Sequence, residues 1–186
     1  SVWSTLLLVS ALILLRVYDP TLVEQVRLNT FDQYIKTLPE QKSNDIILVN
    51  IGEESLGKIG QFPWPRHEYA QMISDLRNIN AGYIGFTIMF PEPDRFGGDD
   101  IFAQYMQDNG IILSQDVDAN GRADSAPYVG YATFGTSDPL DFIYKYEGLV
   151  SNIQYLEQEA WGIGLINAAP EVDNITRRIP LMSNVK

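Results

Sequence analysis

Oxygen-bearing residues at alternate positions between 116 and 124 form the pattern with the most definite chemistry in this sequence of 186 residues. Alternating oxygens with glycine at the sixth position are typical of the first part of a calcium-binding loop. The twelfth position is Pro127 instead of a bidentate acid, so a complete site needs an oxygen from another segment. Asp and Asn also favour ordinary turns, which is the alternative. The expected calcium ligands are Asp116, Asp118, Asn120, the backbone carbonyl of Arg122, and Asp124.

The same segment admits an enzymatic interpretation. An apolar run followed by Asp116-x-Asp118 is similar to the nucleophile motif of haloacid dehalogenase-type phosphatases, in which the first aspartate attacks phosphate and the second is the acid and base. That motif carries Thr or Val where this chain has Asn120, and it comes early in its fold. The chain has no cysteine and a single histidine, His67, which we expect to be solvated in the first turn of a helix. We therefore predict that this domain is not an enzyme.

A second candidate site is centred on Trp64 and Arg66, which offer an aromatic face and a planar guanidinium that fits a carboxylate. Pro63 and Pro65 restrict the backbone on both sides of the tryptophan. We expect this loop to lie at the C-terminal end of a parallel strand. Open α/β sheets bind ligands at that end of their strands. The alternative is that Trp64 covers the core and that Arg66 pairs with a nearby acid such as Asp94.

Two further groups of charged residues complete the candidates. Acidic residues gather between 92 and 100, where they suit a cation or an amine, with helix capping and a solvated loop as the alternative. Arg177 and Arg178 are adjacent, so in a strand one of them can enter a pocket; charges that protect an edge strand are the alternative. Asp173 and Arg177 serve either binding or packing. The candidate ligand-binding residues are Trp64, Arg66, Glu92, Asp94, Asp173 and Arg177.

Hydrophobic periodicity predicts the elements that position these residues. Apolar runs at 46–51, 82–90 and 110–115 indicate buried strands, and amphipathic helices separate them. The first half therefore indicates an α/β fold with a β-α-β-α-β core of parallel strands. Later runs predict strands that extend the core to a mixed sheet with antiparallel members. These runs are 128–134, 142–146, 161–166 and 177–182.

The chain starts with an apolar run, from Val2 to Leu15, that contains no charged residue. At about 1.5 Å per residue this run spans about 21 Å as a helix, less than the ~30 Å hydrocarbon core of a bilayer. We expect residues 1–16 to be the C-terminal part of an uncleaved membrane helix, with a signal peptide or a buried core helix as alternatives. A second helix, ending before Pro39, follows the anchor and can carry mechanical change to it. Residues 17–186 then form the domain outside the membrane.

The formal net charge is −11, from 24 acidic and 13 basic residues. An acidic surface repels phosphate backbones, so the sequence predicts no nucleic-acid partner.

Six short motifs follow one another in a fixed order along the chain. They are ILVNI at 47–51, FPWPR at 62–66, AGYIGF at 81–86, FPEPD at 90–94, PEVD at 170–173 and RRIPL at 177–181. This order resembles the type-two CHASE domain (cyclases/histidine kinases associated sensory extracellular). The resemblance extends from about Tyr18 to Met182, and residues 62–100 are its most specific part.

The resemblance implies a periplasmic ligand-sensing or cue-sensing module of a receptor in the bacterial inner membrane. Such a module passes a conformational signal to a cytoplasmic adenylate or guanylate cyclase, a histidine kinase of a two-component system, or a diguanylate cyclase. A homodimer is expected for such receptors. The expected partners are the membrane and a small ligand, a cation or a periplasmic protein. The alternative is a periplasmic protein-interaction module without a small-molecule pocket.

Three positions depart from the family pattern. Gly52 stands where the family has an acidic residue directly after the first strand, and Thr87 stands in place of an aspartate within the second. Asn174 replaces a glycine. If the missing aspartates contact ligand in the family, this chain binds a different ligand or binds weakly.

Overall fold

The chain divides into two compact units, which are described separately. Unit 1 contains residues 1–49 and 169–177, and unit 2 contains residues 50–168 and 178–186. The computed structural model describes residues 2–40, 43–118, 120–121, 134–135, 138–168 and 170–185.

Unit 1 contains two helices, α1 (Val2–Tyr18) and α2 (Thr21–Thr37), bent by 85° at the break between them. Asp19 occupies the break with a positive φ of 38°, and its carboxylate accepts hydrogen bonds from Arg16 and Arg27. Within the described residues, neither helix is by itself long and apolar enough to cross a membrane. The bent pair passes that test only when the two helices are taken together, by length and composition. The membrane helix therefore stays a prediction.

The main sheet of unit 2 is built around β2 (Ile111–Asp118). Two strands pair with it in parallel, β1 (Ile84–Gly85) and β5 (Gly162–Leu165), and β4 (Gly148–Val150) pairs with its C-terminal half in antiparallel orientation. A second, two-stranded sheet joins β3 (Tyr144–Tyr146) in parallel to β6 (Ser183–Val185). The prediction of mixed helix and strand content with a mixed sheet is confirmed.

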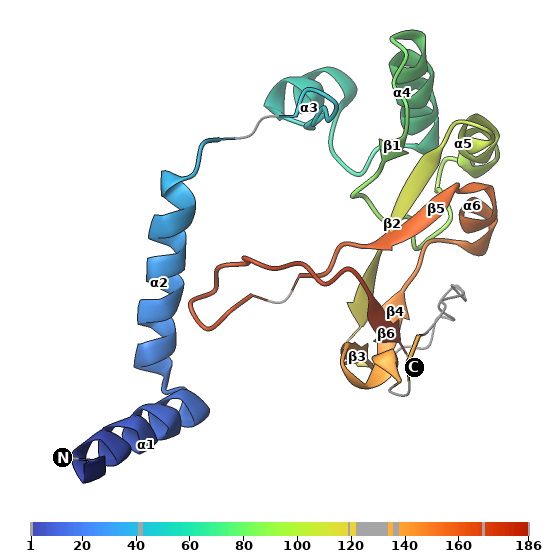
Figure 1. Cartoon of the computed structure of the whole chain (residues 1–186). Coiled ribbons are helices and arrows are strands. Elements are labelled where there is room, and N and C mark those ends of the chain that lie inside the picture. Colours follow the sequence, from blue (N-terminus) through green and yellow to red (C-terminus); the bar gives the residue numbers. More distant parts are fainter. Residues whose placement is uncertain are drawn as a thin grey trace. The chain divides into compact units, whose positions relative to one another are not determined.

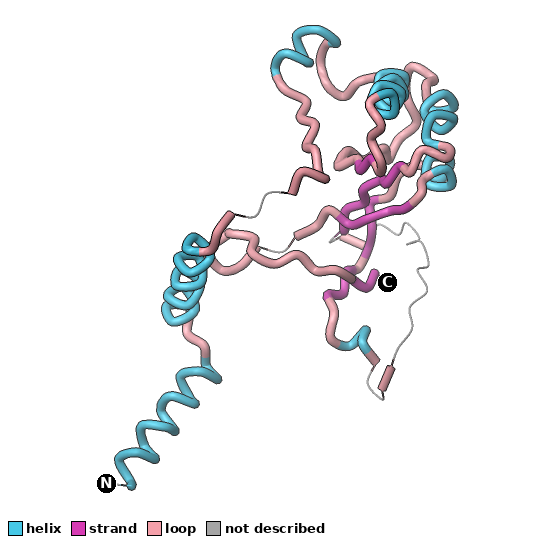
Figure 2. Tube along the Cα trace, turned by 45° about the horizontal axis from the view of Figure 1, so that its top comes forward, coloured by secondary structure: helices cyan, strands magenta, loops and turns pink. Residues whose placement is uncertain are grey.

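Helices cover one side of this sheet, as Figures 1 and 2 show for α4, α5 and α6. Side chains recur at helical spacing on α4 and α5 and face a common core, which Phe86 and Phe90 complete. The rings of Phe90 and Phe102 are 5.0 Å apart, and those of Tyr69 and Phe90 are 5.2 Å apart. The helices of unit 2 are α3 (Glu53–Ile59), α4 (Arg66–Asn78), α5 (Asp99–Met106) and α6 (Gln154–Glu159), with a 3-10 turn, η1 (Pro139–Asp141).

Asn152 is buried in the core of unit 2, with 5% of its surface exposed, and its hydrogen bonds join three segments of the chain. Its side-chain oxygen accepts a hydrogen bond from the backbone N–H of Phe90 at 2.8 Å, and its amide donates to the carbonyl of Ser114 at 3.0 Å. The carboxylate of Glu157 accepts from the backbone N–H of Asn152 at 3.0 Å and from the amide of Gln115 at 2.7 Å. This network satisfies polar groups that would otherwise be costly to bury.

The predicted strand at 46–51 is wrong, because this segment has no strand pairing and Leu48 is 90% exposed. An apolar run becomes a strand only when a neighbouring strand satisfies its backbone, and no described strand pairs with this one. The third parallel strand is β5, from the second half of the chain, so the predicted β-α-β-α-β order is wrong.

The other predicted strands differ from the structure in their limits. The strand predicted at 82–90 is reduced to β1, and the one at 177–182 is replaced by β6. The strands predicted at 110–115, 142–146 and 161–166 correspond to β2, β3 and β5. The one at 128–134 lies outside the described residues except for its last position.

Candidate functional site

The guanidinium of Arg66, a predicted ligand-binding group, is bound by the protein itself. Arg66 begins α4, where Nη2 donates to the carbonyl of Glu92 at 2.8 Å and Nε to the carboxylate of Asp99 at 3.2 Å. The guanidinium also lies 4.4 Å from the centre of the Phe90 ring, a cation–π contact. These contacts hold the loop after β1 against the first turn of α4.

The carboxylate of Asp94 closes the same loop. It accepts hydrogen bonds from the backbone N–H groups of Arg66 at 3.1 Å and Gly98 at 3.0 Å, and Asp99 accepts one from the backbone N–H of Asp94 at 2.8 Å. Burial alone would raise the pKa of Asp94, but the backbone N–H groups of Arg66, Phe96 and Gly98 together lower it. The carboxylates of Asp94 and Asp99 therefore stabilise the local fold.

Trp64 lies in the core with 6% of its surface exposed. Its indole N–H donates to the carbonyl of Gly60 at 2.8 Å, and its ring packs against Phe62 and Tyr69. Trp64 and Arg66 thus lie together at the start of α4. As in the alternative given above, Trp64 covers the core and Arg66 pairs with an acid. The acid that pairs with the Arg66 side chain is Asp99.

Arg177 and Asp173, the other predicted pair, meet in unit 1, where the Arg177 side chain is 6% exposed. Nη2 and Nη1 of Arg177 donate to the two carboxylate oxygens of Asp173 at 2.6 and 2.9 Å, and Nη1 donates to Glu171 at 3.1 Å. Nε and Nη2 form a bidentate pair with Asp32 of α2, each at 2.7 Å. We call Asp32, Glu171, Asp173 and Arg177 the arginine cluster.

The arginine cluster shifts the acid–base equilibria of its members. Hydrogen bonds from Arg177 lower the pKa of Asp32, and they lower the pKa of Asp173 to about 2. The same bonds, to Asp32 first and then Asp173, raise the pKa of Arg177. Asp32, Asp173 and Arg177 are therefore charged at neutral pH. Sequence reasoning missed Asp32 because it lies 145 positions from Arg177.

The predicted calcium ligands are only partly described. Asp116 and Asp118 lie in β2, where a carboxylate oxygen of Asp118 accepts from the backbone N–H of Asn120 at 2.9 Å. Arg122 and Asp124 lie outside the described residues. Within the part of the chain that is described, no three acidic or histidine side chains are grouped so that they could hold a metal ion. Calcium binding at 116–124 stays a prediction.

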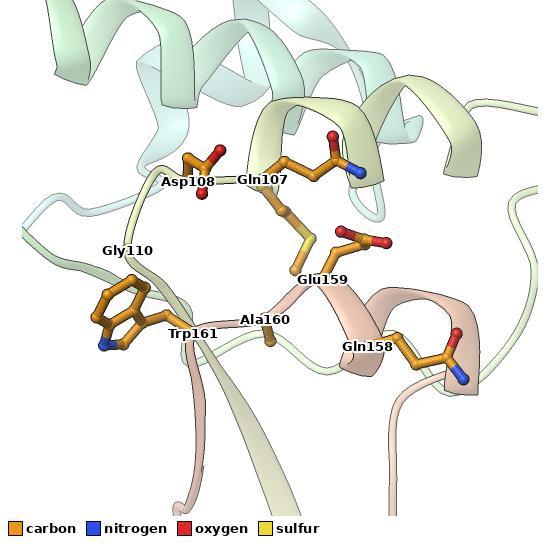
Figure 3. A pocket seen from close by; sticks show the side chains of 8 residues that line it. Gln107, Asp108, Gly110, Gln158, Glu159, Ala160 and Trp161 are labelled. Carbon is orange, nitrogen blue, oxygen red and sulfur yellow. The ribbon is translucent and has the colours of Figure 1, made fainter.

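A recess of about 310 Å³ opens in unit 2 where α5 and α6 end and where β2 and β5 begin. Figure 3 shows Asp108, Glu159 and Trp161 around its opening. The chain turns from α5 into β2 through two residues with positive φ, Asp108 at 56° and Gly110 at 58°. The lining consists of Met106, Gln107, Asp108, Gly110, Gln158, Glu159, Ala160 and Trp161.

Trp161 is the aromatic residue in the lining of this recess, and 67% of its surface is accessible. Its backbone N–H donates to the carbonyl of Ile111 at 2.8 Å, which fixes it at the start of β5. Its ring centre lies 6.1 Å from that of Tyr83. Sequence reasoning missed this recess because it joins two chain turns, at 106–110 and 158–161, that lie outside the six motifs.

The model of the CHASE2 domain family matches residues 5–186, which confirms the resemblance carried by the six motifs. No curated protein and no solved structure matches this chain.

Proposed function

We propose that this chain, which belongs to the CHASE2 family of sensory receptor domains, is the extracytoplasmic sensing module of a bacterial transmembrane receptor. Binding of a ligand or another cue would favour one of two arrangements of the module. The change would pass through the membrane to a cytoplasmic cyclase, histidine kinase or diguanylate cyclase. This role requires no catalysis by the module itself.

The observation that carries the proposal of signal transmission is the arginine cluster. It joins α2, which continues from the apolar helix α1, to the segment 170–177. A bidentate pair between arginine and a carboxylate is directional, so a displacement of that segment moves α2 with it. Helix α2 is then the element that transmits the displacement to the expected membrane anchor.

A spin label on α2 tests this proposal, because the chain has no cysteine of its own. Gln25 is exposed, and Gln25→Cys provides the labelling site. We would first screen the full chain, in lipid nanodiscs, by thermal unfolding against cations and small metabolites. A ligand at ~100 times its dissociation constant adds about 2.7 kcal/mol of stability.

The spectrum of the label should then change when a stabilising compound binds, and Arg177→Gln should remove that change. An exposed substitution of the same kind, Arg95→Gln, is the matched control. A compound that binds without altering the label in the unsubstituted chain would contradict the proposal.

A second candidate function, protein interaction through docking of a second copy of this chain, is favoured by the exposed apolar run Ile46–Val49. Its four side chains are between 57% and 90% exposed. Contiguous exposed apolar surface commonly marks an interface with another protein. Sedimentation of the full chain in detergent distinguishes a homodimer from a monomer. Leu48→Asp should weaken dimerisation through this run without lowering stability, since Leu48 has almost no contacts to lose.

A further inference from the structure

We propose that the recess lined by Asp108, Glu159 and Trp161 binds a small organic cation, such as a quaternary ammonium or a primary amine. This inference rests on the proposed sensory function and names the chemical class of ligand for it. The observations that carry it are an exposed indole, two carboxylates and a concave shape at one place.

The indole of Trp161 supplies an aromatic face for the cation. Tryptophan attracts a cation over its ring more strongly than the other aromatic side chains do. The ring planes of Tyr83 and Trp161 are inclined by 52°, and this contact holds the indole at the opening of the recess. A side chain that is already held in place loses little conformational freedom on binding, which favours affinity.

The carboxylates of Asp108 and Glu159 make the recess negative. In the described part of the chain neither of them forms an ion pair. The nearby guanidinium of Arg77 does not line the recess, and it donates to the backbone carbonyls of Ala81 and Asn109. A cation entering the recess therefore meets two carboxylates that have no other counter-ion among these residues.

The remaining lining groups are compatible with an ammonium. The side-chain amides of Gln107 and Gln158 can each accept a hydrogen bond from an amine through their oxygen. Helix α5 ends at Met106, so the negative end of its dipole adds to the field of the carboxylates. A volume of about 310 Å³ is at the small end of ligand pockets, which limits the ligand to about the size of choline or putrescine.

Isothermal titration calorimetry of the full chain tests this inference, with choline and putrescine as probes. The neutral isostere of choline, 3,3-dimethylbutanol, separates charge from shape. We expect saturable binding of at least one of the two cations, and binding of the isostere that is at least about tenfold weaker. Raising the salt concentration should weaken binding of the cation and leave that of the isostere unchanged.

Substitutions in the recess locate the bound cation. Trp161→Ala should weaken binding at least about tenfold, and Trp161→Phe, which keeps an aromatic ring beside Tyr83, should have an intermediate effect. Glu159→Gln and Asp108→Asn should each weaken binding several-fold. Asparagine tolerates the positive φ at position 108, so the backbone turn is kept. Glu68→Gln, which removes one charge from α4 outside the recess, is the matched control and should have no effect.

Two results would overturn the inference. One is the absence of saturable binding for both cations, and the other is cation binding that Trp161→Ala and Glu159→Gln leave unchanged. Neither result would contradict the proposed sensory role, because a ligand can bind at another site. Conversely, a cation that binds in the recess and leaves the spin label on α2 unchanged would contradict the proposed function and leave the recess as a binding site.

Discussion

The guanidinium carbon of Arg66 lies 4.4 Å from the centre of the Phe90 ring, and the same guanidinium donates to the backbone carbonyl of Glu92 and to the carboxylate of Asp99. One side chain thus joins the first turn of α4, the loop after β1 and the first turn of α5. This combination needs the planar fork of arginine, which lysine cannot reproduce.

Arg66→Lys should therefore destabilise unit 2, although it keeps the positive charge. We expect a loss of about 2 kcal/mol in the free energy of unfolding, because one ammonium cannot replace both hydrogen bonds and keep the contact with the Phe90 ring. Urea unfolding followed by tryptophan fluorescence measures the change. Arg95→Lys, at an exposed position of the same loop, should change stability by less than about 0.5 kcal/mol. Equal effects of the two substitutions would show that Arg66 acts only as a charge.

Gly98→Ala should destabilise the loop after β1 by steric contact alone. Its φ of −88° suits any residue, but a Cβ there would lie 2.8 Å from a carboxylate oxygen of Asp94 and 3.0 Å from the Cβ of Arg66. We expect a loss of ~1–3 kcal/mol. Gly57→Ala is the control, because a Cβ at this position in helix α3 meets nothing within 4 Å. It should stabilise the chain by about 0.5–1 kcal/mol, so calorimetric melting temperatures should move in opposite directions.

Acidification should lower the free energy of unfolding, because it protonates carboxylates of the arginine cluster. Asp173 has an ordinary pKa of 3.8 that Arg177 lowers to about 2, and the pKa of Asp32 is lowered in the same direction. A carboxyl group whose pKa is lower in the folded state stabilises that state fully above its unfolded pKa. This contribution is lost as the pH falls from about 4 to about 2. Melting temperatures across this interval should therefore fall more steeply for the unsubstituted chain than for Arg177→Gln, and parallel curves would refute the prediction.

Asn152→Asp should strongly destabilise unit 2 despite the similar shape of the two side chains. The amide of Asn152 donates to the carbonyl of Ser114, so a carboxylate would place two acceptors together in the core, beside the carboxylate of Glu157. We expect a loss of at least about 3 kcal/mol at neutral pH, measured by urea unfolding. Asn109→Asp is the control, because its amide also donates to backbone carbonyls, those of Tyr105 and Gln107, but does so at an exposed turn where water can replace these bonds. A loss that disappears when the pH is lowered would identify the charge, rather than the lost donor, as the cause.

The parts of the fold that were predicted correctly are those with strong local patterns. Helix α4 and strands β2 and β5 follow from helical spacing and from apolar runs between turn residues. The run at 46–51 carries an equally strong local pattern and is not a strand, because pairing depends on a partner that the run itself does not specify.

The candidate sites follow the same division. Asp173 and Arg177 are four positions apart in the sequence, so their pairing could be expected from spacing. Asp32 belongs to a distant segment of the sequence, and its pairing with Arg177 could not. The recess at Trp161 depends on two turns that only the folded sheet brings together, so residue types alone did not identify it.

The arginine cluster also sets an order of events during synthesis. Asp32 emerges from the ribosome 145 residues before its partner Arg177. At the ~5–20 residues per second of translation, α2 waits for at least about seven seconds before this ion pair can form. A ribosome that stalls before residue 170 leaves Asp32 without any other member of the cluster. The docking of α2 against the segment 170–177 can therefore be completed only after the polypeptide has been made through Arg177.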